Sequence, residues 1–477
     1  MGIPLGRKYW PCCLFLLAAG YPALAAGAEP TTNPATAPAS RPSAAIDGFR
    51  LWACPTPPAT EILPDGESVP PFIFRAPWAV HDTAAQKTFF VYTGILATDG
   101  TSESTPRPAV MTALFDHQNG TVTRPVIVCR DTPAGGCPEP ALVLDEQGYL
   151  YVFVSNGPGQ PSHIYRSRTP RSIDAFESIF QADFVAPQPW YIPKHGFLLI
   201  HLQPHADKNL VCFSTSPDGL AWSEPQPIAA LAAGHRMVSG RFNHKVGVAF
   251  SYEEQPGLPT DLFYLQTSDF GSSWQTADGM NMTLPITEPG NEALLRDYKS
   301  MNRVVYPKDM NFDRAGYPAI LYVSALGPQF KAPRKRRVWY IARWFRDWEI
   351  TGLITSNHNL DAGCLHITPE IWYQLFAPTD PGPQPKTPGG DINVWVSADR
   401  GRSWSRARLT ADHQFNHQDV RRPIDASDDL YAFWVRGDAR KGTHGRILFC
   451  DSKGQVFILP EKMDTPVAQP ERVTFQQ

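Results

Sequence analysis

Basic, histidine and tyrosine side chains gather in short segments that precede apolar runs of this chain. Lysine and arginine bind anionic groups, whereas histidine and tyrosine can transfer protons. The segments are FRAP, the pair Trp190–Tyr191, GHRMVS, VVYPKDM, SNHNLDAG and NHQDVRRP. The candidate site residues in them are Arg75, Trp190, Tyr191, His235, Arg236, Tyr306, Lys308, Asp309, His358, Asp361, His417, Arg421 and Arg422. The set indicates a site that recognises an anion.

Elimination at a uronate is one reaction that such a set supports. It needs a cation that neutralises the carboxylate and a group that removes the neighbouring hydrogen. For the carboxylate the candidates are Arg236, Arg421 and Arg422, and for proton transfer they are His235, Tyr306 and His417. Sugar contacts would come from Arg75, Trp190, Tyr191, Lys308, Asp309, His358 and Asp361. The alternative is pairing within the protein, for example of Arg421 or Arg422 with Asp419 or Asp425.

Three related turns indicate the elements that must position these residues. Thr267–Trp274 (TSDFGSSW) and Ser397–Trp404 (SADRGRSW) follow apolar runs, and Ser216–Trp222 (SPDGLAW) is one residue shorter. In each turn the Asp and Ser/Thr side chains can bond backbone N–H groups, the Gly can take a positive φ, and the Trp can pack over the hairpin. The motif resembles the Asp-box, or BNR repeat, of the sialidase-like β-propellers, where it lies on outer hairpins far from the substrate.

The turns belong to a unit that recurs along the chain. Seven segments contain an entry strand, an apolar strand and a second hairpin, at intervals of about 45 to 70 residues, which suits a four-stranded blade. A content of 48 Pro, 35 Gly and 12% aromatic residues also favours turn-rich strands over helices. We predict an all-β chain that forms a seven-bladed β-propeller of the sialidase-like type, with six blades as the alternative.

Four longer segments extend the resemblance. MNFDRAGYPAILYVS, SNHNLDAGCLHI, the stretch from APTDPG to ADRGRSW, and NHQDVRRPIDASDDLYAFWVRGD are similar to secreted BNR-4-type proteins of the sialidase-like superfamily. Some relatives in that superfamily are polysaccharide lyases acting on uronate-containing polymers such as ulvan. The chain departs from those lyases where their second blade opens with a His-Asn-x-Pro-like turn, because Cys137–Pro140 (CPEP) stands there. If that His is the base in the relatives, this chain lacks it.

The N-terminal residues predict export. Arg7 and Lys8 precede a mostly apolar stretch and small residues, the pattern of a cleavable signal peptide over residues 1–28. Residues 29–48 are rich in Pro, Ala and Thr and predict a disordered linker, and residues 49–477 would form a single domain. We therefore expect a secreted or periplasmic protein without integral membrane contact.

Cysteines and charge narrow the function classes further. Cys129 and Cys137 close a short loop and could form a disulfide, whereas Cys54, Cys212, Cys364 and Cys450 are more typical of buried thiols. No CxxC or zinc spacing is present, so we predict no metal site and no required cofactor, with structural calcium and the oligomeric state left open. A net charge of −3 without a basic tract argues against a nucleic-acid partner.

The function expected from the sequence is binding, and cleavage, of an acidic polysaccharide or oligosaccharide at the mouth of a propeller channel. Two alternatives stay open. One is a propeller that binds glycans without catalysis. The other is an exo-sialidase, since Arg75 in FRAP resembles the segment that supplies the first arginine of those enzymes, although no Tyr-Glu pair is evident.

Overall fold

The computed structural model consists of strands and turns, without a helix among the residues that it describes. Because it has no helix there, no described helical segment could span a membrane. The predicted signal peptide, all but the last residue of the predicted linker, Cys54, Arg75 and Cys137 lie outside the described residues. Those residues are 48–49, 51, 61–62, 68–69, 78–96, 107–130, 138–206, 208–255, 257–327, 337–384, 387–438 and 443–475. The prediction of an all-β chain is confirmed.

Four antiparallel sheets of four strands follow one another along the chain. The first contains β8 (Glu139–Leu144), β9 (Leu150–Ser155), β10 (Ser162–Ser167) and β11 (Phe176–Ala182). The second contains β12 (Val185–Ile192), β13 (Gly196–His205), β14 (Lys208–Ser216) and β15 (Gln226–Ala229). The third contains β16 (Gly234–Phe242), β17 (Lys245–Glu253), β18 (Pro259–Thr267) and β19 (Leu294–Arg296). The fourth contains β20 (Arg303–Phe312), β21 (Pro318–Leu326), β22 (Arg337–Phe345) and β23 (Asp347–Ser356).

Larger sheets precede and follow these four, and β1 (Glu61–Ile62) pairs with β2 (Ser68–Val69) in a separate small sheet. The N-terminal large sheet contains β3 (Ala79–Asp82), β4 (Lys87–Leu96), β5 (Arg107–Asp116), β6 (Thr121–Thr123), β7 (Val126–Cys129) and β32 (Val467–Ala468). The C-terminal sheet contains β24 (Cys364–Ile367), β25 (Tyr373–Pro381), β26 (Gly390–Ser397), β27 (Ser405–Arg408), β28 (Asn416–Arg421), β29 (Ala432–Asp438), β30 (Thr443–Cys450), β31 (Val456–Ile458) and β33 (Glu471–Val473).

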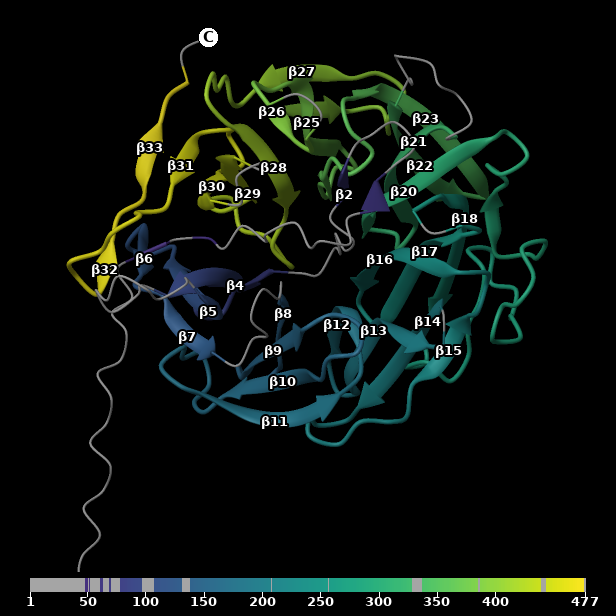
Figure 1. The fold of residues 1–477 in the computed structure, drawn as a ribbon, viewed down its shortest axis with the longest axis horizontal. Helices are drawn as coiled ribbons and strands as arrows, with labels where there is room; N and C mark the ends of the chain where they lie inside the picture. The colour runs from purple at the N-terminus through teal and green to yellow at the C-terminus, as the bar shows by residue number, and fades with distance from the viewer. Residues whose placement is uncertain are drawn as a thin grey trace, which may run out of the picture. The chain divides into compact units, whose positions relative to one another are not determined.

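The sheets lie in chain order around a common centre, with the first strand of each four-stranded sheet nearest to it (Figure 1). Neighbouring first strands touch, as β8 and β12 do, and β16 and β20. Burial decreases toward the outer strand of a sheet. The middle strands β9 and β18 are buried along their whole length, whereas the outer strand β23 is mostly half-buried or exposed. A strand covered on both faces by neighbouring sheets has a mostly apolar sequence, whereas the outermost strand faces water.

Residues from the two ends of the described chain meet in the N-terminal sheet. Strand β32 pairs with β6, so the C-terminal region completes a sheet that begins the fold. Val80 in β3 also forms a parallel bridge with Ile424, which follows β28. These pairings join segments more than 300 residues apart, and no local pattern in the sequence could specify them.

The three recurrent turns have the hydrogen bonds that the sequence predicts. In Ser397–Trp404, Asp399 accepts bonds from the backbone N–H groups of Arg402 and Ser403, and Gly401 has a positive φ of 87°. The hydrogen bonds from Ser403 to the carboxylate lower the pKa of Asp399. The turns connect β14 to β15, β18 to β19 and β26 to β27, the third and fourth strands of their units. Their acids therefore serve local structure, on outer hairpins.

Cys212, Cys364 and Cys450 are buried thiols, as predicted. Burial raises the pKa of Cys212 to about 12 and that of Cys364 well above its usual value, so neither is a reactive thiolate near neutral pH. The Cys129–Cys137 disulfide stays a prediction, because Cys137 is outside the described residues.

Candidate functional site

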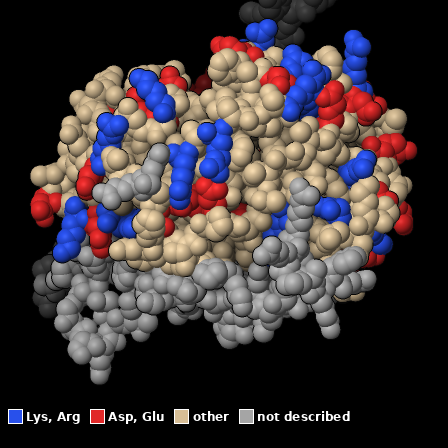
Figure 2. All heavy atoms as spheres, turned by 90° about the horizontal axis from the view of Figure 1, so that it is seen from above, with Lys and Arg blue, Asp and Glu red and all other residues tan. Residues whose placement is uncertain are grey.

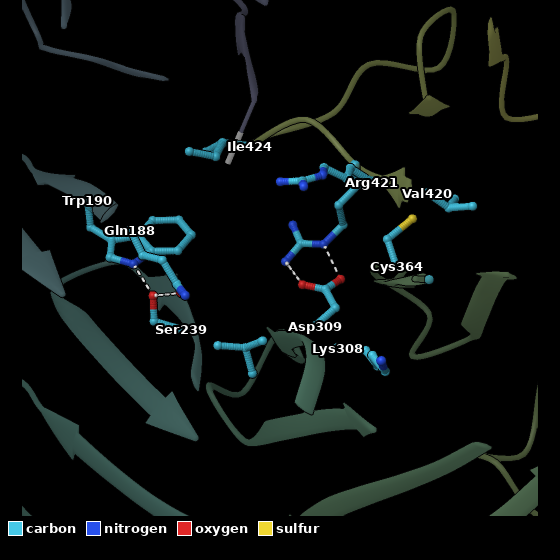
Figure 3. A pocket seen from close by; sticks show the side chains of 12 residues that line it. Gln188, Trp190, Ser239, Lys308, Asp309, Cys364, Val420, Arg421 and Ile424 are labelled. Carbon is cyan, nitrogen blue, oxygen red and sulfur yellow. Dashed lines mark hydrogen bonds and ion pairs between the residues drawn. The ribbon is translucent and has the colours of Figure 1, made fainter. Parts of the chain in front are cut away.

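A cavity lies where the first strands meet. About 510 Å³ of space lies within it, which includes space open to solvent. The lining comes from β12, β16, β20, β28 and the segment around the start of β24 (Figure 3). The lining residues are Gln188, Trp190, Val238, Ser239, Lys308, Asp309, Gly363, Cys364, Val420, Arg421, Arg422 and Ile424.

Irregular pairing occurs at two of the places where neighbours in sequence line the same cavity. Regular strands turn successive side chains to opposite faces, yet Lys308 and Asp309 both line it, as do Arg421 and Arg422. The register of β20 shifts between Pro307 and Asp309, and that of β28 shifts before Arg421. An extra residue in one strand re-aims the side chains after it, so these two irregularities gather the charged groups.

Asp309 and Arg422 form an ion pair across the cavity wall. The Nε of Arg422 lies 3.0 Å from Oδ2 of Asp309, and its Nη2 donates to the carbonyl of Met310 at 2.9 Å. The backbone N–H groups of Met310 and Leu365 donate to the same carboxylate. Burial opposes the charge on Arg422, but the Asp309 carboxylate outweighs it and raises the pKa of the guanidinium. The pair is therefore a fixed, charged part of the wall.

Arg421 presents its guanidinium to the cavity from the same segment (Figure 3). The group stacks on the ring of Trp78, 3.8 Å from its centroid, and Nη2 lies 3.3 Å from Oδ1 of Asp419. Stacking on an aromatic face holds a guanidinium in one plane and leaves its edge directed outward. A ligand carboxylate in the cavity would meet an oriented donor.

The opposite wall is a hydrogen-bonded row of uncharged side chains (Figure 3). Trp190 Nε1 donates to Ser239 Oγ at 2.8 Å, and Ser239 donates to Gln188 Oε1 at 2.6 Å. The amide of Gln188 in turn donates to the carbonyl of Met237 at 3.2 Å. The chain of bonds fixes the indole, which is 6% exposed; its contact with a sugar stays a prediction. Tyr191 follows Trp190 but is not among the lining residues; its hydroxyl lies 3.4 Å from Glu146 Oε2.

A line of cations and one phenol extends from the cavity toward the starts of β16 and β20. The ring of Tyr306 lies between Lys308 Nζ, 5.4 Å from its centroid, and the guanidinium of Arg236, 5.3 Å from it. The Tyr306 hydroxyl donates to the carbonyl of Gly257 at 3.2 Å, and Arg236 pairs with Glu253 at 2.8 Å. Of these residues only Lys308 lines the cavity. The sequence analysis thus grouped residues that form two neighbouring clusters linked by Lys308.

Both predicted catalytic histidines lie inside hydrogen-bond networks rather than on the cavity wall. His235 Nδ1 donates to the carbonyl of Asn209 at 2.6 Å, and its Nε2 accepts the N–H of Leu231 at 3.2 Å. His417 is fully buried, its Nδ1 accepts from Trp434 Nε1 at 2.8 Å, and its Nε2 lies 3.3 Å from Asp412. Burial lowers the pKa of both rings, that of His235 to about 4. This geometry favours structural roles for the two rings.

The His235 network predicts acid sensitivity. A neutral ring in the fold whose pKa is about 4, against about 6.5 in the unfolded chain, binds a proton first in the unfolded state. This contribution to stability is complete above about pH 6.5 and is lost as the pH falls toward about 4. His235→Gln keeps a donor for Asn209 and an acceptor for Leu231 but cannot titrate. We expect urea unfolding of the variant to show a shallower loss of stability over that window, and parallel pH profiles would contradict this.

His358 and Asp361 form a buried turn behind Lys308. The carboxylate of Asp361 accepts the backbone N–H groups of Asn357 and His358 and, through its other oxygen, that of Gly389. His358 Nδ1 accepts the N–H of Leu360 at 3.1 Å. Lys308 Nζ donates to the carbonyl of Asn359 in the same turn. These two residues position the amine and do not line the cavity.

The sequence analysis missed Gln188, Ser239 and Cys364 as lining residues. Ser239 lies in the selected segment GHRMVS and Cys364 directly follows SNHNLDAG, whereas Gln188 lies two residues before the selected pair Trp190–Tyr191. Their small or uncharged side chains carried no chemical signal by themselves. The position of each segment in the repeating unit was the signal in the sequence that could have identified these residues as lining the cavity.

The lining of the cavity carries more cations than acids. Three of its lining side chains, Lys308, Arg421 and Arg422, are cations, whereas Asp309 is the one acid among them. Converging cations in a concave site attract and orient anions. Among the described residues no group of three or more His, Cys, Asp or Glu side chains could hold a metal ion.

Comparison with known proteins shows a likeness of fold to solved structures of polysaccharide lyases. No protein-family model matches the chain, and no curated protein matches it. The chain is similar to the solved structure of an ulvan lyase of polysaccharide lyase family PL25, with a TM-score of 0.64 and 14% identity over 79% of this chain and 94% of that one. The structure of a PL25 ulvan lyase bound to -[GlcA(1-4)Rha3S]- matches equally well. The polysaccharide lyase Uly1 has a TM-score of 0.54 and 11% identity, over 79% and 90%.

Proposed function

We propose that this chain binds an acidic, uronate-containing polysaccharide in the central cavity and cleaves it by elimination. The observation that carries the proposal is the excess of cations around a cavity whose other wall holds an ordered indole. The likeness to ulvan lyases adds a fold on which such chemistry occurs. Export through the predicted signal peptide, to the periplasm or beyond the cell, is part of the same proposal.

The proposed architecture is a seven-bladed β-propeller with the three recurrent turns as Asp-boxes. The N-terminal sheet and the four four-stranded sheets supply five blades. The nine-stranded sheet supplies two more, because its halves are joined through a single pair, Gly390 with His417, between β26 and β28. Its first half then contains β24 to β27 and its second half begins with β28. In this arrangement the cavity lies at the channel, where the inner strands converge.

In the proposed reaction Arg421 binds the uronate carboxylate. The charge of the guanidinium makes the hydrogen on the adjacent ring carbon more acidic. Removal of that proton leaves its electron pair to form a carbon–carbon double bond, while the bond to the leaving sugar oxygen breaks and that oxygen takes a proton. Tyr306 is our candidate for taking this proton and returning one to the leaving oxygen. Its hydroxyl donates to the carbonyl of Gly257 and, like His235 and His417, it does not line the cavity, so a movement of its side chain toward the cavity is part of the proposal.

Glycan binding without catalysis is the second candidate function. The buried hydrogen bonds of His235 and His417 favour it, since these rings are not placed to move protons in the cavity. A hydrolase and an exo-sialidase are the remaining alternatives.

One assay distinguishes these functions. It offers uronate polymers, sialosides and neutral glycans, and follows the absorbance of unsaturated uronates together with new reducing ends. Unsaturated products support the lyase, reducing ends alone support a hydrolase, and neither signal with retained binding supports the binding protein.

Replacing Arg421 by alanine tests the proposed carboxylate contact. Loss of one preorganised donor to developing charge costs about 100- to 1000-fold in turnover, and we expect a loss of that order on uronate polymers. Folding should persist, because Asp419 remains partly exposed when its partner is removed. Arg168→Ala removes an exposed arginine from the sheet of β8 to β11 and is the matched control. Full activity of Arg421→Ala with the same melting temperature would exclude the assigned role.

A further inference from the structure

We infer that a second contact site for the same anionic polysaccharide lies on the outer turns of two neighbouring sheets. We call it the rim site and define it by Tyr317, Phe345, Arg346 and Arg400. The inference rests on the proposed function for its ligand class, but it uses residues that have no part in the cavity. Tyr317 lies after β20, Phe345 and Arg346 lie at the β22–β23 turn, and Arg400 lies in the turn between β26 and β27.

Ring contacts join the three turns into one surface. Tyr317 and Phe345 meet edge to face, with ring centroids 5.7 Å apart. The guanidinium of Arg346 lies 5.6 Å from the Phe345 centroid, and that of Arg400, from the neighbouring sheet, lies 5.8 Å from it. Tyr317 is 38% exposed and Phe345 is 40% exposed. Aromatic rings this accessible, with cations beside them, differ from ordinary packing residues.

The acids of these turns are occupied by local hydrogen bonds. Asp313 Oδ1 accepts the backbone N–H groups of Ala315 and Tyr317 at 2.9 and 3.0 Å. Asp399 accepts from the backbone and hydroxyl of Ser403. Arg346 and Arg400 form no ion pair with a carboxylate in the part of the chain that the structure describes. Asp347 and Asp399 are themselves exposed beside these arginines, but their oxygens accept local hydrogen bonds, from Trp348 and Ser403. The turns thus present two guanidinium groups beside exposed rings.

This chemistry matches a charged sugar polymer. Guanidinium groups bind carboxylate and sulfate oxygens through paired N–H donors, and exposed aromatic faces pack on the apolar faces of sugars. Figure 2 views the side on which β23 and β27 lie in Figure 1, and there Lys and Arg are interspersed with Asp and Glu. This side therefore has no predominantly positive surface that would attract an acidic polymer. Recognition of the polymer would come from the guanidinium groups that lie beside exposed rings.

The rim site and the cavity share no residue. The cavity is lined by first strands and adjoining residues, whereas Phe345, Arg346 and Arg400 lie on turns that follow third strands; Tyr317 lies on the turn after the first strand β20 but does not line the cavity. A long polymer held at two sites gains affinity from the second contact, but a short oligosaccharide can occupy only one. The rim site therefore predicts a difference between long and short substrates.

The test compares binding and turnover in the double variant Arg346→Ala/Arg400→Ala. Affinity electrophoresis in gels containing ulvan or polygalacturonate measures polymer binding, with gels containing a neutral glucan as reference. We expect the apparent dissociation constant for the acidic polymer to rise about five- to tenfold, as for two lost charged contacts on a partly exposed surface. Turnover of a uronate tetrasaccharide should stay within about twofold of the wild-type rate. Arg168→Ala, another exposed arginine, should change neither quantity.

The outcomes separate the two proposals. If the wild-type protein is not retarded by any acidic polymer, the proposed function fails and the rim site fails with it. If the wild type is retarded and the double variant is retarded equally, the proposed function stands and the rim site is excluded. Equal retardation of the wild type by the neutral glucan would also exclude it, because guanidinium recognition requires an anion.

Discussion

Replacing Trp274 by alanine is expected to lower the free energy of unfolding by about 3–5 kcal/mol, the usual cost of removing a buried tryptophan. The ring is 2% exposed and lies 5.3 Å from that of Phe213, in the neighbouring sheet. Its removal would open a cavity between two sheets in the largest apolar cluster of the fold. Equilibrium urea unfolding followed by circular dichroism measures the loss.

Two further variants sharpen the Trp274 prediction. The indole N–H of Trp274 has no hydrogen-bond partner among the described atoms, so Trp274→Phe should cost clearly less than alanine. Trp404, at the equivalent position of another turn, is only half-buried and donates to the carbonyl of Gly401 at 3.1 Å. We expect Trp404→Ala to destabilise less than Trp274→Ala. Equal losses at the two positions would show that the turn itself, rather than burial between sheets, determines the cost.

Replacing Arg422 by alanine should destabilise the fold by a similar amount, about 3–5 kcal/mol, the cost of breaking a buried ion pair. The side chains of Arg422 and Asp309 are 16% and 18% exposed. The change would leave the Asp309 carboxylate in the cavity wall without its cation. It would also remove the donor to the carbonyl of Met310. Loss of activity in this variant would therefore reflect unfolding as well as chemistry, unlike loss of activity in Arg421→Ala.

The double variant Asp309→Asn/Arg422→Ala tests this explanation. A neutral amide at position 309 can still accept the backbone N–H of Leu365 at the place where Asp309 does now. It leaves no unpaired charge, so we expect the double variant to regain part of the stability lost in Arg422→Ala. The free energies of unfolding of both variants, of Asp309→Asn and of the wild type, measured in urea, complete a double-mutant cycle. A double variant less stable than Arg422→Ala would contradict the ion-pair explanation.

The sequence by itself determined the strands, their turns and the segments that line the cavity. Each depends on neighbours in the chain: apolar runs predict buried strands, and Ser/Thr, Asp and Gly at fixed offsets specify a turn such as Ser397–Trp404. The entry segments recur at one place in the unit, so Trp190, Asp309 and Arg421 were found without a structure. Burial of Cys212 and Cys364 followed from the same apolar runs.

Only the tertiary structure decided which of the selected side chains share the cavity. A strand turns neighbours to opposite faces, so Trp190 lines the cavity and Tyr191 does not, and register shifts that no local pattern predicted bring in Lys308 beside Asp309. The partner of Arg422 is 113 residues away in the chain. The same long-range packing buries His235 against the backbone of another strand. The capacity of a histidine such as His235 to transfer a proton follows from its residue type. Whether its ring can reach a ligand depends on contacts that form only when the sheets assemble.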